Sequence, residues 1–202
     1  MAGVQGQVKQ DELDAQREVL RRLALGQVRQ YPDPVLRMRA NEVAEFDGAL
    51  EGLVERMSRL MHDAGGVGLA APQVGVLRRV VVYQTVQDAP LQALVNPVVV
   101  ARSDELETVE EGCLSLGAAS VVVDVERPVT IAVEARSPQG EELRIEAEGL
   151  EARVVQHELD HLDGVLIIDR ASPEQRRAAL GQLRPPPILG AREAPALVQE
   201  EA

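Results

Sequence analysis

The sequence of 202 residues is short of aromatic side chains, cysteine and histidine, and its only lysine is Lys9. Aromatic residues make up 1% of the chain, so a hydrophobic core has to be built from Val, Leu, Ile and Ala. The single cysteine, Cys113, excludes an internal disulfide framework. There is no apolar stretch typical of a signal sequence and no run of about 18 apolar residues that could span a bilayer. We therefore expect a reduced, cytoplasmic protein.

Clustered positive charge is missing as well. The net charge is −12 and the isoelectric point is near 4.8, which argues against broad contact with nucleic-acid phosphate. We expect no membrane partner and no sequence-specific nucleic acid. An apolar content of 45% and a charged content of 27% are ordinary for a soluble globular protein. The length predicts one domain with tails.

The chain divides into three parts. Residues 1–27 are polar and are expected to form a flexible N-terminal extension, within which Leu13, Leu20, Leu23 and Leu25 allow a short amphipathic helix. Residues 28–183 are expected to form the compact domain. Residues 184–202 contain three consecutive prolines and are expected to form a flexible tail.

Apolar spacing predicts the secondary structure of the domain. Helices are expected over residues 49–62 and 150–162, and another from about residue 172. Strands are expected over residues 80–83, 93–100, 106–109, 121–125, 129–135 and 142–147, with a hairpin turn at 138–140. Strands followed by a strongly patterned helix indicate an α+β domain whose sheets pack around the 150–162 helix.

Two of the three histidines, His157 and His161, are four residues apart in the segment His-Glu-Leu-Asp-His. On a helix, this spacing places both imidazoles on one face, which suits a divalent metal. Glu158 is close enough to handle the protons of a water on that metal. The alternative is a helix that merely carries polar residues, which is disfavoured in a chain with so few histidines. Asp160 points in another helical direction and is expected to have a supporting or packing role.

Cys113, within Glu-Gly-Cys-Leu-Ser at residues 111–115, is the best candidate for a third ligand. The alternative is that a lone cysteine is a small buried hydrophobic residue. A His, His, Cys set leaves the fourth tetrahedral position open, as in a catalytic metal site.

A third segment, residues 66–73, is rich in glycine and ends in Gln73. It lacks a Lys-Ser/Thr pair and a surrounding βαβ unit, so a phosphate-binding loop is excluded. Two interpretations are left: a turn that links a helix to a strand, or a segment close to a ligand to which Gln73 offers an amide N–H.

With these three segments in chain order, residues 28–183 resemble the peptide deformylase family, which has a glycine-led motif ending in Gln, a Glu-Gly-Cys-Leu-Ser motif and a His-Glu-x-x-His motif. The resemblance implies an α+β fold in which a central metal-binding helix is surrounded by antiparallel and mixed β-sheets. It also implies removal of the N-formyl group from the N-terminal methionine of nascent proteins, with release of formate.

The resemblance also implies roles for residues. Cys113, His157 and His161 would hold a divalent metal, typically Fe²⁺, with Zn²⁺, Ni²⁺ or Co²⁺ as substitutes. Glu158 would transfer protons. The side chain of Gln73 and the backbone N–H of Leu114 would stabilise negative charge on the formyl oxygen.

Substrate contacts can be predicted too. An apolar slot for the methionine side chain is expected from Val67, Val109, Leu150 and Val154, and Gly68 could hydrogen-bond the peptide backbone. For Leu150, an ordinary core position is nearly as good an interpretation. The stem of Arg153 is expected along the pocket rim, with its guanidinium in water.

The chain departs from the family pattern at residues 116–120, where a proline and a following arginine are missing. This departure concerns how the distal part of the substrate is held. The expected partners are N-formyl-methionyl nascent peptides and the ribosome near its exit tunnel, to which Arg176, Arg177 and Arg184 could contribute. The rival hypotheses are a zinc peptidase, which shares His-Glu-x-x-His, and a non-catalytic metal-binding or ribosome-associated relative.

Overall fold

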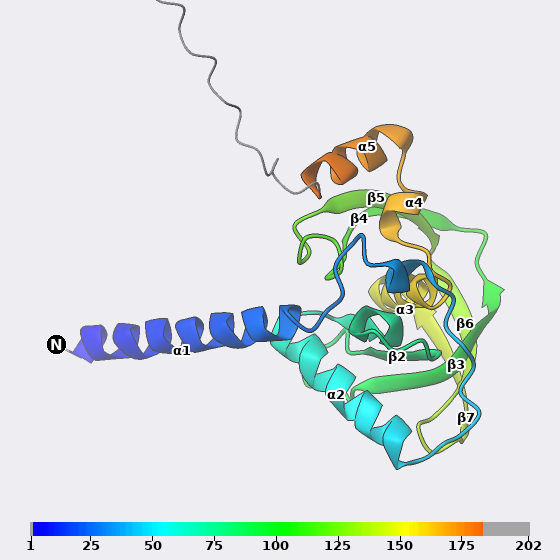
Figure 1. Ribbon diagram of the computed structural model, residues 1–202, viewed down its shortest axis with the longest axis horizontal. Coiled ribbons are helices and arrows are strands. Elements are labelled where there is room, and N and C mark those ends of the chain that lie inside the picture. The colour runs from blue at the N-terminus through cyan, green and yellow to red at the C-terminus, as the bar shows by residue number, and fades with distance from the viewer. Residues whose placement is uncertain (1, 184–202) are drawn as a thin grey trace, which may run out of the picture.

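The computed structural model describes residues 2–183, with side chains from residue 14 onward (Figure 1). Its helical elements are α1 (Ala2–Leu25), η1 (Pro34–Arg37), α2 (Gly48–Ala64), η2 (Ala71–Val74), α3 (Gly149–Leu162), α4 (Ile167–Arg170) and α5 (Pro173–Gln182). Its strands are β1 (Gly68–Ala70), β2 (Val80–Tyr83), β3 (Gln92–Arg102), β4 (Leu106–Gly112), β5 (Val122–Pro128), β6 (Thr130–Arg136) and β7 (Glu142–Glu148). None of the helices within residues 2–183 is long and apolar enough to cross a membrane.

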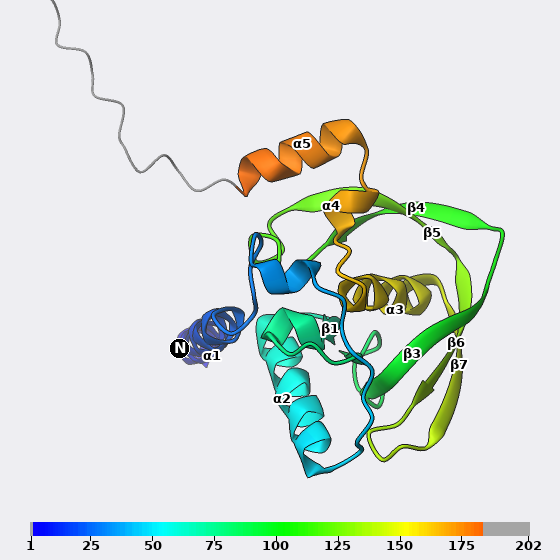
Figure 2. The same cartoon turned by 45° about the vertical axis from the view of Figure 1, so that its right-hand side comes forward.

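The strands form two sheets in which all neighbouring strands are antiparallel. One has five strands in the order β1-β2-β3-β6-β7, and the other pairs β4 with β5. Figure 2 shows β4 and β5 arching over one side of α3 while β3, β6 and β7 lie on the other. The hairpin between β6 and β7 turns at residues 138–140, as predicted, and the Gly140 N–H donates to the Ser137 carbonyl.

Helix α3 lies inside the domain, so most of its positions are buried. Its apolar side chains, including Val155, Leu159 and Leu162, pack against β2, β6 and β7 in a core that is aliphatic except for Tyr83. A second core joins α2 to β1 and β2, and a third joins β5 to α4 and α5. Because α3 contacts β1, β2, β5, β6 and β7, the polar residues in its sequence have fixed positions in the interior.

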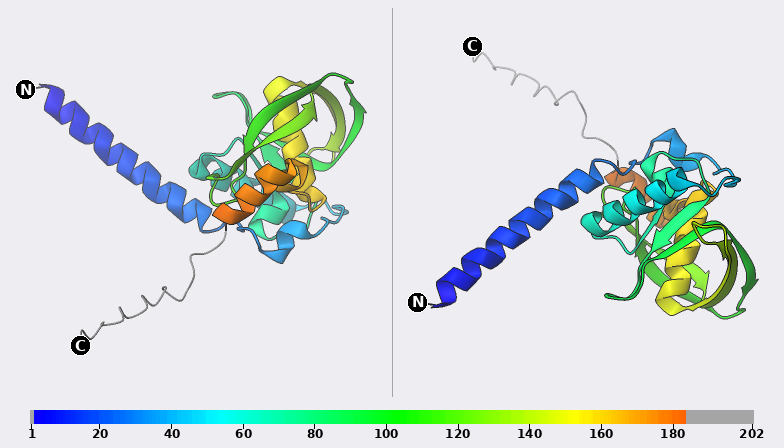
Figure 3. Two further views of the ribbon diagram at one scale, coloured as in Figure 1. Left: turned by 90° about the horizontal axis from the view of Figure 1, so that it is seen from above. Right: turned by 90° about the horizontal axis from the view of Figure 1, so that it is seen from below.

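The predicted fold class is confirmed, and the predicted strands and helices of the domain match the observed ones to within a few residues. Four short elements were not predicted: strand β1 and the 3-10 turn η2, which carry the glycine-rich segment, and the one-turn helices η1 and α4. At the N-terminus, the short helix expected near Leu13–Leu25 is a longer one, α1, which packs on α2 and extends away from the domain (Figure 3). Flexibility of the termini stays a prediction, and residues 184–202 lie outside the described part.

The end of α3 is fixed to the segment after η1. The Ala40 N–H donates to the Leu162 carbonyl at 2.7 Å, and the Val165 N–H donates to the Asp160 carbonyl at 2.9 Å. Gly164, in the turn that follows α3, has φ +73°. A Cβ at this position would lie 2.6 Å from the carbonyl oxygen of Arg37. Glycine is therefore required by both the backbone conformation and the close approach of a second backbone.

We expect Gly164→Ala to destabilise the protein more than Gly65→Ala. Gly65 has the same φ of +73°, but a methyl group added there would meet no atom within 4 Å, so its substitution isolates the conformational cost. That cost is about 1–2 kcal/mol, and the clash at Gly164 adds about 1–3 kcal/mol for overpacking. Chemical denaturation of both variants measures the difference. Equal losses of unfolding free energy would contradict the role given to the backbone contact.

Candidate metal centre

Three potential metal ligands meet at the centre of the domain. His157 and His161 lie one turn apart on α3 with ring centroids 5.1 Å apart, and Cys113 follows the end of β4. The donor atoms of these three residues all lie within 4.8 Å of one another, and Cys113 Sγ is 3.2 Å from His161 Nε2. Donors around a tetrahedral ion bound at about 2.0–2.3 Å are separated by roughly 3.5 Å. The cluster therefore fits a single metal ion.

The burial of the cluster and the protonation state of His161 also fit a metal. Cys113 and His161 are buried, and the Nδ1 atom of His161 has no hydrogen-bond partner within the described residues. Burial lowers the pKa of His161 well below its usual value, with further lowering from the charge of His157. A neutral imidazole is the form that binds metal.

Glu111 orients the other histidine. Its Oε2 atom is 3.0 Å from His157 Nδ1, so the Nε2 atom of His157 is the one available to a metal. Two arginines hold the same carboxylate: Arg127 donates to both oxygens, at 2.6 and 2.9 Å, and Arg153 donates to Oε1 at 2.8 Å. Burial opposes ionisation of Glu111, but the hydrogen bonds from Arg127 and His157 lower its pKa to about 2. Glu111 is therefore a permanent anion beside the cluster.

Glu158 has the opposite surroundings. Its side chain is buried, and its Oε2 atom has no hydrogen-bond partner among residues 14–183. Burial raises the pKa of Glu158 to about 7. Its Oε1 atom lies so close to Gly68 that a Cβ there would approach it to 2.5 Å, so only glycine leaves room for this carboxylate.

Gln73 presents its amide nitrogen to the cluster. Its Oε1 atom accepts a hydrogen bond of 2.8 Å from the Ala70 N–H, which fixes the amide orientation. Its Nε2 atom donates to Ser115 Oγ at 3.2 Å and lies 3.8 Å from Cys113 Sγ. The neighbouring Leu114 N–H makes no hydrogen bond within the described chain. Two N–H donors therefore lie next to the metal ligands.

A cleft of about 280 Å³ opens onto the cluster. Four of the predicted substrate-binding residues line it: Val67, Gly68, Leu150 and Val154. The fifth, Val109, is not part of the lining; it pairs with Val125 across β4 and β5 and is 39% exposed.

The guanidinium of Arg153 was expected in water, and that prediction is wrong. Arg153 is 9% exposed and donates hydrogen bonds to Glu111 and to the backbone carbonyls of Val125 and Glu107. The guanidinium can be buried because Glu111 and the backbone carbonyls of β4 and β5 accept its hydrogen bonds in place of water. Its partners were missed in the sequence, although Glu111 is part of the same motif as Cys113.

Asp160 lies outside the ligand set, as its helical direction predicts. It pairs with Arg127 at 2.9 Å and with Arg170 at 2.6 Å. Through Arg127 it supports Glu111, and through Glu111 it supports His157.

A Cys, His, His cluster with an open cleft and an adjacent buried carboxylate defines a metal-dependent hydrolase. The family model of polypeptide deformylase matches residues 25–177. The peptide deformylase of Natranaerobius thermophilus is 48% identical over 149 residues, which are 74% of this chain and 94% of the relative. Peptide deformylase 1 of Corynebacterium glutamicum is 44% identical over 164 residues, which are 80% of this chain and 96% of the relative.

Solved structures agree with these relatives. The peptide deformylase of Thermotoga maritima has a TM-score of 0.69 and 46% identity, covering 72% of this chain and 97% of that one. The Synechococcus elongatus enzyme in complex with actinonin has a TM-score of 0.73 and 38% identity, covering 77% and 85%. The chain belongs to the polypeptide deformylase family. This family removes the N-formyl group from nascent peptides in a metal-dependent reaction.

We expect Glu111→Gln to weaken metal binding by about 10- to 100-fold, because partners that orient a ligating histidine typically contribute this much. Competitive metal titration of the anaerobic protein measures the change. Glu110→Gln is the matched control: this residue is adjacent and exposed and has no bond to His157. Unchanged affinity in a folded Glu111→Gln variant would contradict the orienting role.

Proposed function

We propose that this chain deformylates N-formyl-methionyl nascent peptides with a metal held by Cys113, His157 and His161, and that Glu158 is its proton-transfer residue. The observation that carries the proposal is a buried carboxylate without a partner, directly beside a three-ligand cluster that faces a cleft. A purely structural metal site needs neither the cleft nor the carboxylate.

A thiolate and two imidazoles suit several divalent ions, and we propose Fe²⁺, with Zn²⁺, Ni²⁺ or Co²⁺ as substitutes. When bound, such an ion lowers the pKa of water and polarises a carbonyl group. The rest of the chemistry belongs to the protein.

Glu158 accepts the proton of the attacking water and then delivers it to the departing amine. A pKa of about 7 suits both steps, because the carboxyl can take up and release a proton near neutral pH. Gly68 makes room for this carboxylate beside the cleft.

Attack on the formyl carbon places negative charge on its oxygen. The Gln73 amide and the Leu114 backbone N–H lie beside the ligands and would donate to that oxygen. One preorganised donor of this kind is typically worth about 3 kcal/mol of transition-state stabilisation. The Ala70 contact supports this role, since it prevents the amide of Gln73 from turning.

The lining of the cleft suits the methionine side chain of the proposed substrate. Val67, Leu150 and Val154 offer apolar surface along it, and the stem of Arg153 adds to one wall while its charge is bound elsewhere. An unbranched thioether fits such a narrow apolar slot.

The zinc peptidase alternative is weaker. Peptidases with His-Glu-x-x-His usually take a third His or Glu from downstream, whereas here Cys113 lies with the two histidines. We propose a cytoplasmic enzyme that meets its substrates as they leave the ribosome. Arg176, which could contact the ribosome, already lies 3.5 Å from Asp169, and Arg184 is outside the described residues.

The decisive experiment is anaerobic purification, metal analysis and an assay with formyl-Met peptides. We expect one metal per chain and release of formate without cleavage of internal peptide bonds. If Fe²⁺ is the native ion, activity decays in air and is preserved by Ni²⁺ substitution. Internal cleavage would favour the peptidase, and a metal-loaded but inactive chain would favour the non-catalytic relative.

We expect Glu158→Gln to keep the metal and to lower kcat by about 10²- to 10⁴-fold, the usual contribution of general acid–base catalysis. The substitution nearly keeps the side-chain volume but removes the titratable carboxyl and its charge. Metal content and kcat of the same preparation should be measured together. Substantial turnover with full metal content would refute the role of Glu158.

We expect Cys113→Ser to weaken metal binding or to change which ion is preferred, because a hydroxyl is a harder and more weakly binding ligand than a thiolate. Ser115→Ala is the control: it removes a neighbouring hydroxyl without touching the donor set. Both variants should be compared by metal analysis and by affinity for Fe²⁺ and Zn²⁺. Unaltered metal content and preference in Cys113→Ser would remove Cys113 from the ligand set.

A further inference from the structure

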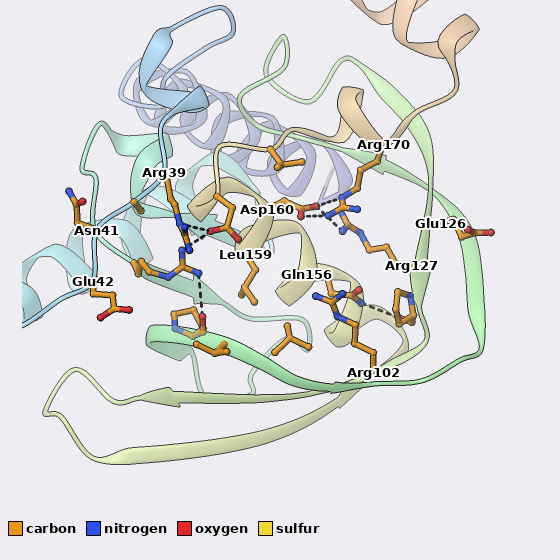
Figure 4. Close-up of a pocket in the computed structure, with 18 residues that line it drawn as sticks. Arg39, Asn41, Glu42, Arg102, Glu126, Arg127, Gln156, Leu159, Asp160 and Arg170 are labelled. Carbon is orange, nitrogen blue, oxygen red and sulfur yellow. Dashed lines mark hydrogen bonds and ion pairs between the residues drawn. The ribbon is translucent and has the colours of Figure 1, made fainter.

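A second cavity, of about 800 Å³, lies on a different face of α3 from the metal site. Helix α3 contributes Gln156, Leu159 and Asp160 to this cavity, whereas it contributes Val154, His157 and Glu158 to the catalytic cleft. Five arginines line the second cavity, which we therefore name the arginine pocket (Figure 4): Arg39, Arg79, Arg102, Arg127 and Arg170.

The acidic residues that face these arginines are shared. Asp163 lies 2.8 Å from Arg79 and 3.6 Å from Arg39. Asp160 is likewise shared between Arg127 and Arg170. Asp163 therefore serves two guanidinium groups, so one positive charge is left over there. At Asp160 the charges are more nearly balanced, because Arg127 also pairs with Glu111.

Two glutamates also belong to the lining, but neither neutralises the arginines. Glu42 and Glu126 are exposed, and no ion pair joins either of them to an arginine within the described residues. Figure 4 shows the Glu126 side chain projecting outward from β5. In a chain whose net charge is −12, the two guanidinium groups beside Asp163 therefore have one directly paired carboxylate between them.

Arg102 differs from the other four arginines of the pocket because its side chain has no partner among the described residues. It stands at the end of β3, is exposed, and has no hydrogen bond or ion pair with any described residue. The other four arginines of the cavity each pair with an aspartate, so Arg102 is the one whose charge no direct partner offsets among the described residues. A bound anion would offset that charge.

We propose that the arginine pocket binds a small anion carrying two or more phosphate or carboxylate groups. The planar guanidinium matches both kinds of oxyanion and binds either with two parallel hydrogen bonds. Figure 4 shows Arg39 on one side of the pocket and Arg170 on the other, which favours a ligand with charge at more than one position. The cavity also falls within the range of about 300–1,000 Å³ typical of small-molecule sites. This proposal does not depend on the proposed function.

Isothermal titration of the metal-loaded full chain at low ionic strength tests it, with fructose 1,6-bisphosphate and tricarballylate as probes. We expect one site for at least one probe, weakened by added NaCl. Arg102→Ala should lower the affinity by about tenfold, the effect of losing one charged hydrogen bond of about 1.5 kcal/mol. Formyl-peptide hydrolysis and metal content should not change, since Arg102 touches neither the cleft nor the ligands.

Arg144→Ala is the matched control, because it also removes one exposed positive charge but lies on β7 outside the pocket. Binding of the bisphosphate alone would identify phosphate groups as the ligand chemistry, and binding of tricarballylate alone would identify carboxylates. The proposal is overturned if neither probe binds at millimolar concentration, or if Arg102→Ala and Arg144→Ala lose the same affinity. Competition by a formyl-Met peptide would also overturn it, because it would place the anion in the catalytic cleft.

Discussion

The structure depends most on the buried carboxylate of Glu111. It accepts hydrogen bonds from Arg127 and Arg153 and orients His157, so it joins the β4–β5 pair to α3 at the metal site. A buried ion pair of this kind contributes little net stability compared with an apolar replacement, whereas removal of one partner alone is strongly destabilising. Its value lies in position: the histidine can ligate a metal only in the orientation that the carboxylate fixes.

Helix α3 makes this arrangement possible because it is surrounded by other elements. A helix on the surface would place one face in water, but α3 packs against strands of both sheets. Of its two histidines, His157 therefore lines the cleft, while Asp160 faces the arginine pocket and reaches Glu111 only through Arg127. Residues of α3 line both cavities, and the guanidinium of Arg127 joins Asp160 in one cavity to Glu111 in the other.

The sequence predicted the domain well because its signals are local. Helical and strand periodicity gave the elements, and the three motifs named every residue of the metal cluster and Gln73. The long-range polar contacts could not be predicted, since nothing in the local sequence links Arg127 or Arg153 to Glu111. Strand β1 was missed for a related reason: three residues, one of them glycine, form a strand only because β2 offers an edge to pair with. Arg153 shows most clearly what the sequence alone cannot predict. A charged residue beside a cleft is expected in water, and only the folded structure shows that buried acceptors bind its guanidinium.

The two carboxylates near the metal site differ in their surroundings, and this difference determines what each can do. Glu111 accepts hydrogen bonds from Arg127, Arg153 and His157 and has a pKa of about 2, so it stays charged and serves as a fixed anchor. Glu158 is buried with one oxygen unpartnered and has a pKa of about 7, so it can exchange a proton at neutral pH. Environments that separate the pKa values of two like groups are how active sites divide acid–base roles. Because the two arginines direct their hydrogen bonds to Glu111 and to other acceptors, the network that orients His157 also leaves Glu158 without a charged hydrogen-bond partner among the described residues, as the proposed proton transfer requires.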